Sequence, residues 1–191
     1  MSSKYDSSNI IVLSDIKHIQ ERKNMYIGEA EDPRHLIIEI IDNALDEVQA
    51  GYSDEIIVNI DTKKNIYEVR DFGRGIPHGM KKLEDGTEKE VIAVLLTKSN
   101  SGGKFNNDAY SVSSGLNGLG LTITNALSNF IEITSYRKGK YVKGYCEASN
   151  DVKLEYGDTT EKTGTRVIFQ PNKKFFHTDK IPVDFVLKKC K

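Results

Sequence analysis

The stretch from Pro33 to Gly51 constrains the fold of this chain more than any other part of the sequence. Proline suits the first position of a helix, and glycine suits the residue just past its end. Apolar residues recur between them at the spacing of one helical face: Leu36, Ile37, Ile40, Ile41, Ala44, Leu45 and Val48. We therefore predict a single long helix over residues 33–51, with the rest of the domain organised around its apolar face.

The other side of this predicted helix carries an unusual order of polar side chains. A histidine, two acids and an amide follow at four-residue spacing, with a third acid beside the amide: His35, Glu39, Asn43 and Glu47, with Asp46. Carboxylate and amide oxygens on one line can hold a hard cation and place a general base near it. Acidic residues on an amphipathic helix more often form a solvated face, and this helix taken alone favours that simpler interpretation.

Size and charge narrow the possible classes of protein. The chain has 191 residues, enough for one domain with a sizeable core, and its net charge of -1 gives no overall case for nucleic-acid binding by this piece. Cys146 and Cys190 lack the spacing of metal ligands, so we expect free thiols in a reducing compartment. The apolar runs are too short to cross a bilayer, and no signal peptide opens the chain. We expect a cytoplasmic protein with no membrane association.

The remaining pattern predicts short helices and hairpins around one sheet. We expect a polar arm over residues 1–13 and one domain over residues 14–191. Short helices are expected at 14–24, 90–98, 121–128 and 184–191, with an apolar staple at 25–28. Strands are expected at 55–60, 66–70, 130–136, 141–147, 153–156 and 166–170. Because strands and helices do not alternate regularly, we predict an α+β fold, a two-layer α/β sandwich whose mixed, mostly antiparallel sheet is covered on one face by helices.

Two glycine-rich segments mark places where the backbone must approach something closely. Residues 71–77, DFGRGIP, directly follow the first predicted hairpin, and Asp71 points into this loop. Residues 99–120 are rich in Gly, Ser and Asn, which is typical of a functional lid or of disorder. The end of this segment, GLNGLG at 115–120, precedes a helix and is a candidate phosphate cradle, although glycines before a helix are common in ordinary turns.

The acidic helix and the two glycine-rich segments together resemble the N, G1 and G2 boxes of the GHKL ATPase superfamily. The matching segments are EIIDN at 39–43, DFGRG at 71–75 and GLNGLG at 115–120. Further segments, YDSS at 5–8, MYIG at 25–28 and GGKF at 102–105, are similar to the ATPase subunits of type IIA DNA topoisomerases, and the resemblance covers nearly the whole chain. MutL repair proteins, heat-shock chaperones and sensor histidine kinases share the boxes but lack these segments.

The resemblance implies ATP hydrolysis assisted by Mg²⁺. Glu39 would be the general base that activates water, and His35 matches a histidine thought to assist it, although an ordinary histidine at a helix start is an equally good interpretation. Asn43 matches the magnesium ligand, and Asp46 lines the same pocket. A salt bridge between Glu47 and Arg74 is implied, which would fix the 71–77 loop against the helix.

The resemblance also implies contacts to each part of the nucleotide. Asp71 matches the acid that accepts a hydrogen bond from the adenine amino group, aided by Thr165. Gly75 and Pro77 would contribute further contacts to the nucleotide. The adenine would be walled by Ile40, Val69, Ile76, Ile92 and Val167, which can also be explained simply as core residues. The triphosphate would be wrapped by Ser114, Gly115, Leu116, Asn117, Gly118, Leu119 and Gly120, with Lys104 and Tyr110 from the lid, where Lys104 is otherwise a solvated lysine. Arg137 falls where aminocoumarin-type inhibitors are held in bacterial enzymes.

The partners implied by the resemblance lie beyond the chain itself. Tyr5 and Ile10 match arm residues that reach a partner subunit and its nucleotide, so ATP would drive homodimerisation and operate a gate for DNA strand passage. DNA and a second subunit carrying the cleavage tyrosine, or the same chain fused to it, would complete the enzyme. Because the family places a catalytic lysine in a following transducer domain, we expect a fragment with weak ATPase activity that is mainly monomeric without nucleotide. The alternatives are another GHKL ATPase, or an ATP-gated dimerisation module without turnover.

Departures from the family pattern leave the source open between a viral and a divergent bacterial enzyme. Asn117 stands where bacterial gyrases typically have histidine, and Phe72 replaces a second acid often found there. Lys23 and Asn24 replace a usual Pro-Gly pair. None of these changes removes a residue that the implied chemistry needs.

Overall fold

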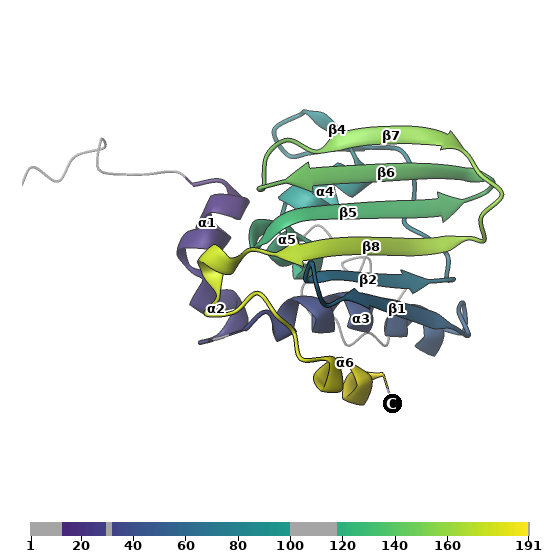
Figure 1. Ribbon diagram of the computed structural model, residues 1–191. Helices are drawn as coiled ribbons and strands as arrows, with labels where there is room; N and C mark the ends of the chain where they lie inside the picture. The colour runs from purple at the N-terminus through teal and green to yellow at the C-terminus, as the bar shows by residue number, and fades with distance from the viewer. Residues whose placement is uncertain (1–12, 30–31, 100–117, 191) are drawn as a thin grey trace, which may run out of the picture.

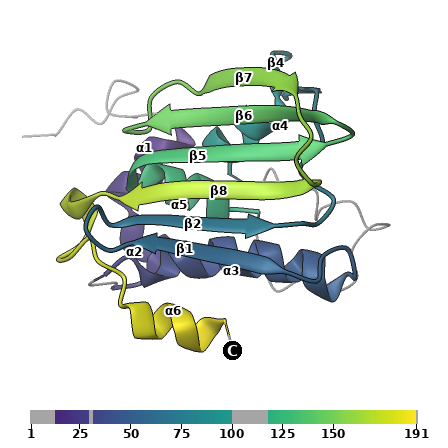
Figure 2. The same ribbon diagram turned by 45° about the vertical axis from the view of Figure 1, so that its right-hand side comes forward.

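The computed structural model describes residues 13–29, 32–99 and 118–190. Within these ranges six strands form one sheet in the order β1-β2-β8-β5-β6-β7, and each pair of neighbours is antiparallel (Figure 1, Figure 2). The strands are β1 (Ile56–Asp61), β2 (Ile66–Asp71), β5 (Ser128–Arg137), β6 (Lys140–Glu147), β7 (Lys153–Asp158) and β8 (Gly164–Pro171). The predicted α+β class is confirmed, and the strand that comes last in the chain lies in the middle of the sheet.

The hairpins of this sheet form for local reasons. Between β1 and β2, the Asp61 carboxylate accepts two backbone N–H groups, at 2.9 and 3.0 Å, and Asn65 takes a positive φ of 54°. Between β5 and β6, Lys138 and Gly139 both have positive φ, 53° and 73°, which matches the twist of a two-residue hairpin turn. These turns set the register of both hairpins and therefore decide which side chains face the core.

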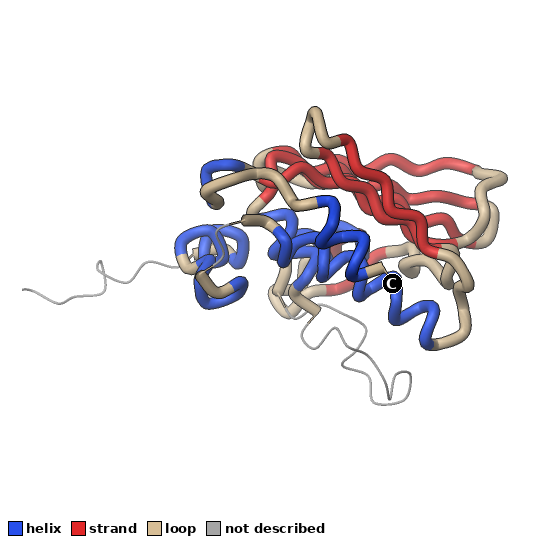
Figure 3. Tube along the Cα trace, turned by 60° about the horizontal axis from the view of Figure 1, so that its bottom comes forward, coloured by secondary structure: helices blue, strands red, loops and turns tan. Residues whose placement is uncertain are grey.

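The helices cover one face of the sheet (Figure 3). The predicted long helix is α3 (Arg34–Gln49), which has Pro33 at its N-cap and is followed by Gly51 with φ +76°. Its apolar side packs on α5 (Gly120–Ala126) and on the inward side chains of β2 and β8, while α5 also packs on β5. The fully buried side chains of this core include Leu36, Ile37, Ile41, Tyr67, Ile131, Ile133 and Phe169. The layer of helices over a sheet therefore matches the predicted sandwich.

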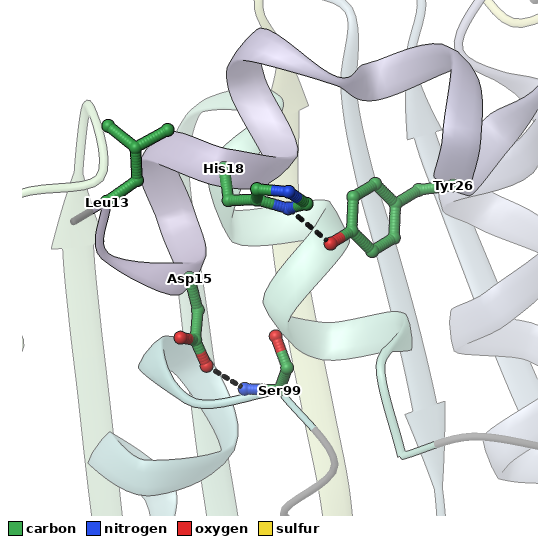
Figure 4. A pocket seen from close by; sticks show the side chains of 5 residues that line it. All are labelled: Leu13, Asp15, His18, Tyr26 and Ser99. Atoms are coloured by element: carbon green, nitrogen blue, oxygen red, sulfur yellow. Dashed lines mark hydrogen bonds between the residues drawn. The ribbon is translucent and has the colours of Figure 1, made fainter. Parts of the chain in front are cut away.

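The first helical region consists of two helices, α1 (Asp15–Glu21) and α2 (Lys23–Ile27), where we predicted one. Together with the segment after α4 (Val91–Thr97) they surround a small open hollow (Figure 4). In this hollow the Asp15 carboxylate accepts the backbone N–H of Ser99 at 2.6 Å, and the His18 ring lies 2.8 Å from the Tyr26 hydroxyl. These two bonds hold the two helices to each other and to the segment after α4.

The apolar staple predicted at residues 25–28 is only partly correct. Tyr26 and Ile27 pack against the core, but the side chain of Met25 is 75% exposed. The reason is that this stretch is helical, so consecutive side chains point in different directions and cannot all face inward.

Other elements differ from the predictions in extent. The helix predicted at 121–128 ends at Ala126, because Ser128 already pairs with Pro171 in the sheet. The hairpin of β3 (Met80–Lys82) and β4 (Glu88–Glu90) was not predicted, since its charged sequence has no apolar alternation. After the 3-10 turn Lys173–Phe175, the last element is α6 (Val183–Lys189), which lies beside α3 and pairs Lys189 with Asp42 at 2.7 Å.

None of the helices in the described ranges is long and apolar enough to cross a membrane. Both cysteines are free, as predicted, with Cys146 buried in the core and Cys190 exposed at the end of α6.

Candidate active site

The buried carboxylate of Asp71 is the centre of the candidate site. Asp71 is the last residue of β2, is only 6% exposed, and accepts the backbone N–H groups of Gly73 at 2.9 Å and of Thr165 at 3.2 Å. Both bonds go to the same oxygen, Oδ1. Burial raises the pKa of Asp71, and the charge of Glu47 raises it further, whereas the two backbone N–H groups and Arg70 oppose that rise. The site therefore holds a desolvated acid whose Oδ2 receives neither of these bonds.

The turn that follows Asp71 is pinned to α3 on one side. The carboxylate of Glu47 accepts two bonds from the Arg74 guanidinium, at 2.7 and 3.1 Å, and one from the Arg74 backbone N–H at 2.9 Å. At Gly73 a Cβ atom would lie 2.5 Å from the Glu47 carboxylate, so only glycine allows this approach. The salt bridge expected between Glu47 and Arg74 is present, and it joins the central helix to the glycine turn.

On its other side the turn is pinned to β5. The Ser135 hydroxyl donates to the Ile76 carbonyl at 2.8 Å, and the Arg137 guanidinium donates to the Gly75 carbonyl at 3.2 Å. The His78 ring nitrogen lies 3.2 Å from both oxygens of Ser135. Gly75 has φ +69°, and a Cβ there would lie 2.8 Å from the Tyr136 carbonyl. The turn is therefore fixed in shape by the two elements on either side of it.

The polar stripe of α3 lies along the same site and is more open. His35 and Glu39 face each other at 3.3 Å, and their side chains are 32% and 29% exposed. Asn43, one turn further along, is exposed, whereas Asp46 is buried. The first residue of α5 comes close to this stripe, because a Cβ on Gly120 would lie 2.6 Å from a carboxylate oxygen of Glu39. Glu39 thus lies where α3 and the start of α5 meet.

Comparison with known proteins agrees with this geometry. Residues 28–174 match the family model described as histidine kinase-, DNA gyrase B- and HSP90-like ATPase. The chain belongs to this ATPase family. It is 38% identical to the DNA gyrase B protein of Halalkalibacterium halodurans over 90% of the chain, and 39% identical to the DNA topoisomerase 4 B protein of Mycoplasma capricolum over 100% of it. It is 35% identical to the DNA gyrase B protein of Archaeoglobus fulgidus over 98% of the chain.

The chain is much shorter than these relatives. It spans 27%, 29% and 30% of the lengths of the Halalkalibacterium, Mycoplasma and Archaeoglobus proteins, respectively. The similarity therefore concerns the part of each relative that corresponds to an ATPase domain of this family.

The structure brings together most of the residues that the sequence singled out for an ATPase site. Thr165, Arg137 and the 71–77 turn meet at the start of β8 and the end of β5, and the stripe of α3 runs beside them. Ile40, Val69, Ile92 and Val167 are buried, Ile76 is half-buried and Pro77 is exposed. Gly118, Leu119 and Gly120 lead into α5, with Gly118 at φ +59°. Tyr5, Ile10, Lys104, Tyr110, Ser114, Gly115, Leu116 and Asn117 lie outside the described residues.

The sequence patterns did not reveal two residues that support this ATPase site, Ser135 and Arg70. Ser135 is fully buried, and its hydroxyl holds the turn. A signal was present in the sequence, because Ser135 lies on the predicted strand 130–136, two residues before Arg137, and strand geometry continued to Arg137 puts both on one face. Arg70 stands directly before Asp71 but on the opposite face of β2, and its contacts depend on tertiary structure alone.

Proposed function

We propose that this chain is the ATP-binding and ATP-hydrolysing module of a type II DNA topoisomerase. The single observation that carries the proposal is the joining of a buried acid at the end of β2 to the acidic stripe of α3 through the Glu47–Arg74 salt bridge. The similarity to the B proteins of DNA gyrase and topoisomerase 4 supports the same module. It also favours a topoisomerase module over the other members of this ATPase family.

Base recognition is assigned to Asp71. Because the bonds from Gly73 and Thr165 both go to Oδ1, Oδ2 is left to accept a bond from the 6-amino group of adenine. A hydrogen bond to a charged group contributes about 1.5–3 kcal/mol, enough to favour adenine over guanine, which presents a carbonyl at that position. Thr165 assists through its backbone N–H, which orients the acid.

Water activation is assigned to Glu39, with His35 as its partner. At 3.3 Å the imidazole can hydrogen-bond the carboxylate and hold it in one orientation, which leaves the other oxygen to take a proton from water. The half-exposed position of Glu39 beside the start of α5 suits this role, since water can reach it.

The donor set of α3 fits Mg²⁺ bound together with a nucleotide. The amide oxygen of Asn43 is an exposed hard ligand one turn from Glu39, and the described residues contain no cluster of three or more His, Cys, Asp or Glu side chains able to hold a metal by themselves. Mg²⁺ commonly takes only one or two protein ligands, with phosphate oxygens and water completing its shell. Bound there, the ion would neutralise charge on the phosphates, while Asp46 and Glu47 shape the surrounding wall.

Around the phosphates, we propose that Gly118, Leu119 and Gly120 present backbone N–H groups at the start of α5, together with residues 104, 110 and 114–117. Nucleotide binding would drive homodimerisation through Tyr5 and Ile10 and so operate a DNA gate. The complete enzyme would act in the cytoplasm with DNA and with the subunit, or fused region, that carries the cleavage tyrosine. Arg137, which holds the glycine turn, would also bind aminocoumarin-type inhibitors.

The test measures phosphate release and nucleotide binding separately. We expect the chain to bind ATP with Mg²⁺ and to release phosphate slowly, and a longer protein that contains it to relax supercoiled DNA in an ATP-dependent manner. Binding without any phosphate release by the longer protein would replace the enzyme by an ATP-gated dimerisation module. ATP turnover without any change in DNA topology would instead assign the module to another branch of the ATPase family.

A further inference from the structure

Arg70 is a buried arginine whose guanidinium lies against two aromatic rings. It lies on β2 directly before Asp71 and is 6% exposed. Its guanidinium carbon lies 4.0 Å from the centre of the Tyr136 ring and 5.1 Å from the centre of the Phe72 ring. Guanidinium groups stack on aromatic faces through cation–π attraction, and this attraction strengthens when the pair is shielded from water. The two rings therefore hold the guanidinium in one place.

Arg70 faces away from the nucleotide site. Side chains alternate along a strand, and Val69 and Asp71 point to the face covered by helices, so Arg70 points to the other face. In the neighbouring strand β8, Arg166 lies directly opposite Arg70, and its charge is paired with Glu68 at 2.8 Å. Arg70 therefore cannot contact a nucleotide, and any effect on binding must pass through a neighbouring group.

That neighbouring group is the turn that leads into β8. The Arg70 guanidinium donates to the carbonyl of Lys162 at 2.7 Å. Three residues later, the backbone N–H of Thr165 donates to the Asp71 carboxylate at 3.2 Å. Between them, Gly164 has φ +144°, and it approaches Asp71 so closely that no Cβ atom would fit. The turn is thus held by Arg70 from one face of the sheet and by Asp71 from the other.

We propose that Arg70 is a positioning residue for base selection: stacked on Tyr136 and Phe72, it fixes the turn at 162–165, whose backbone orients the Asp71 carboxylate. An arginine suits this role because its planar group can stack on a ring and donate in its own plane at once, which a lysine cannot do. This inference rests on the proposed function, since it takes Asp71 as the group that recognises the adenine amino group.

The test compares two nucleotides that differ only in that amino group. ADP and purine riboside diphosphate, which has hydrogen in place of the 6-amino group, are titrated calorimetrically with Mg²⁺ into the chain. We expect the wild type to prefer ADP by about tenfold or more, as one hydrogen bond to a charged group implies. In Arg70→Met, which keeps an unbranched side chain next to the two rings, we expect that preference to fall to about twofold. Binding of the purine riboside nucleotide should change little.

The control is Lys143→Met, which removes a cation from the same face of the sheet, two strands further from the turn than Arg166. It should keep the wild-type preference. A merely structural role for Arg70 would weaken both nucleotides equally or lower the melting temperature while leaving their ratio unchanged, and either result would overturn the inference. If the wild type itself fails to bind ADP, or binds both nucleotides equally, the proposed base site is wrong rather than the role of Arg70.

A second variant serves if Arg70→Met does not fold. Tyr136→Leu removes the closer ring and keeps the arginine, and we expect it to lower the preference for ADP by about threefold, because the guanidinium loses its nearer stacking partner. An unchanged preference in a folded Tyr136→Leu protein would contradict the proposal.

Discussion

The candidate site has two ends that are built in different ways: the Asp71 end, proposed to bind adenine, and the α3 end, proposed to activate water. At the Asp71 end, the acid is 6% exposed and one carboxylate oxygen accepts two backbone N–H groups, one from Gly73 in the adjoining turn and one from Thr165 at the start of β8. Along α3, the Glu39 side chain is 29% exposed and faces His35 across 3.3 Å. The first arrangement is fixed before any ligand binds, and the second remains accessible to water. Recognition and hydrolysis should therefore respond separately to mutation.

The largest expected effect comes from a substitution that disrupts the α3 end alone. Replacing the proposed base, Glu39→Gln, should lower the turnover number by about 10²–10⁴-fold, because general base catalysis contributes that much. Nucleotide affinity should change little, since Glu39 is not part of the Asp71 end. Phosphate release and calorimetric titration measure the two quantities, with Glu88→Gln on exposed β4 as the control. Turnover close to wild type would remove Glu39 as the base.

The next effect concerns the shape of the glycine turn. Gly75→Ala should lower the free energy of unfolding by about 2–4 kcal/mol. Alanine would have to adopt the left-handed backbone conformation of Gly75, and its Cβ atom would clash with the Tyr136 carbonyl. Gly51→Ala is a matched control, because Gly51 has a similar φ of +76° with nothing within 4 Å of a Cβ. It should cost only about 1–2 kcal/mol, the backbone term alone. Urea denaturation measures both, and equal losses would show that the turn is not closely packed.

The third prediction concerns a substitution that disrupts the Asp71 end alone. Asp71→Asn keeps the size of the side chain and an oxygen for the backbone N–H groups, but it replaces the remaining acceptor by a donor. ATP affinity should fall by about 10–100-fold, as expected for one hydrogen bond to a charged group. Turnover at saturating ATP should fall far less than in Glu39→Gln. If Asp71→Asn reduced turnover as strongly as Glu39→Gln, the two ends would not be separable.

The smallest effect is a pH dependence of stability. Folding raises the pKa of Asp71 above its ordinary value of 3.8, chiefly through burial, so the folded state binds this proton more tightly than the unfolded state. The contribution of Asp71 to stability is therefore present at low pH and is lost as pH rises from that ordinary value through the raised one. The free energy of unfolding of Asp71→Asn, relative to wild type, should increase as pH rises through this window.

A carboxylate with the opposite shift provides the control for this titration. Hydrogen bonds from Thr87 lower the pKa of Asp85, which is fully exposed, so its contribution to stability is present above its ordinary value and lost below the lowered one. Relative to wild type, Asp85→Asn should therefore lose stability as pH rises, the reverse of Asp71→Asn. Urea denaturation at several pH values measures both differences, and curves of the same sign would contradict the assignment for Asp71.

The sequence predicted what depends on local periodicity and on short motifs. The apolar spacing of 33–51 located α3, and the motif at 71–75 located Asp71 and the turn. It could not predict α2 as a separate helix or the exposure of Met25, because both depend on the end of α1 at Arg22 and the start of a second helix, which turns Met25 away from the core. The β3–β4 hairpin is held by backbone pairing between charged residues, which leaves no apolar signal.

The finer parts of the site were unpredictable for the same reason. Ser135 and Arg70 act through the backbone of the 76–78 and 162–165 segments, and only the pairing of β2, β8 and β5 brings those segments within reach. A motif specifies which side chains are present, but it does not predict which carbonyl group a side chain contacts after folding.

The central position of β8 determines how late in synthesis the proposed nucleotide site can be completed. Thr165 is 94 residues beyond the acid it orients, and the strand that carries it is inserted between two strands made earlier. A nascent polypeptide on the ribosome would already contain Glu39, Asn43 and Asp71, but the carboxylate proposed to accept the adenine amino group would lack the Thr165 N–H that orients it. The ability to bind nucleotide would then arise late and in one step, when β8 leaves the exit tunnel and enters the sheet.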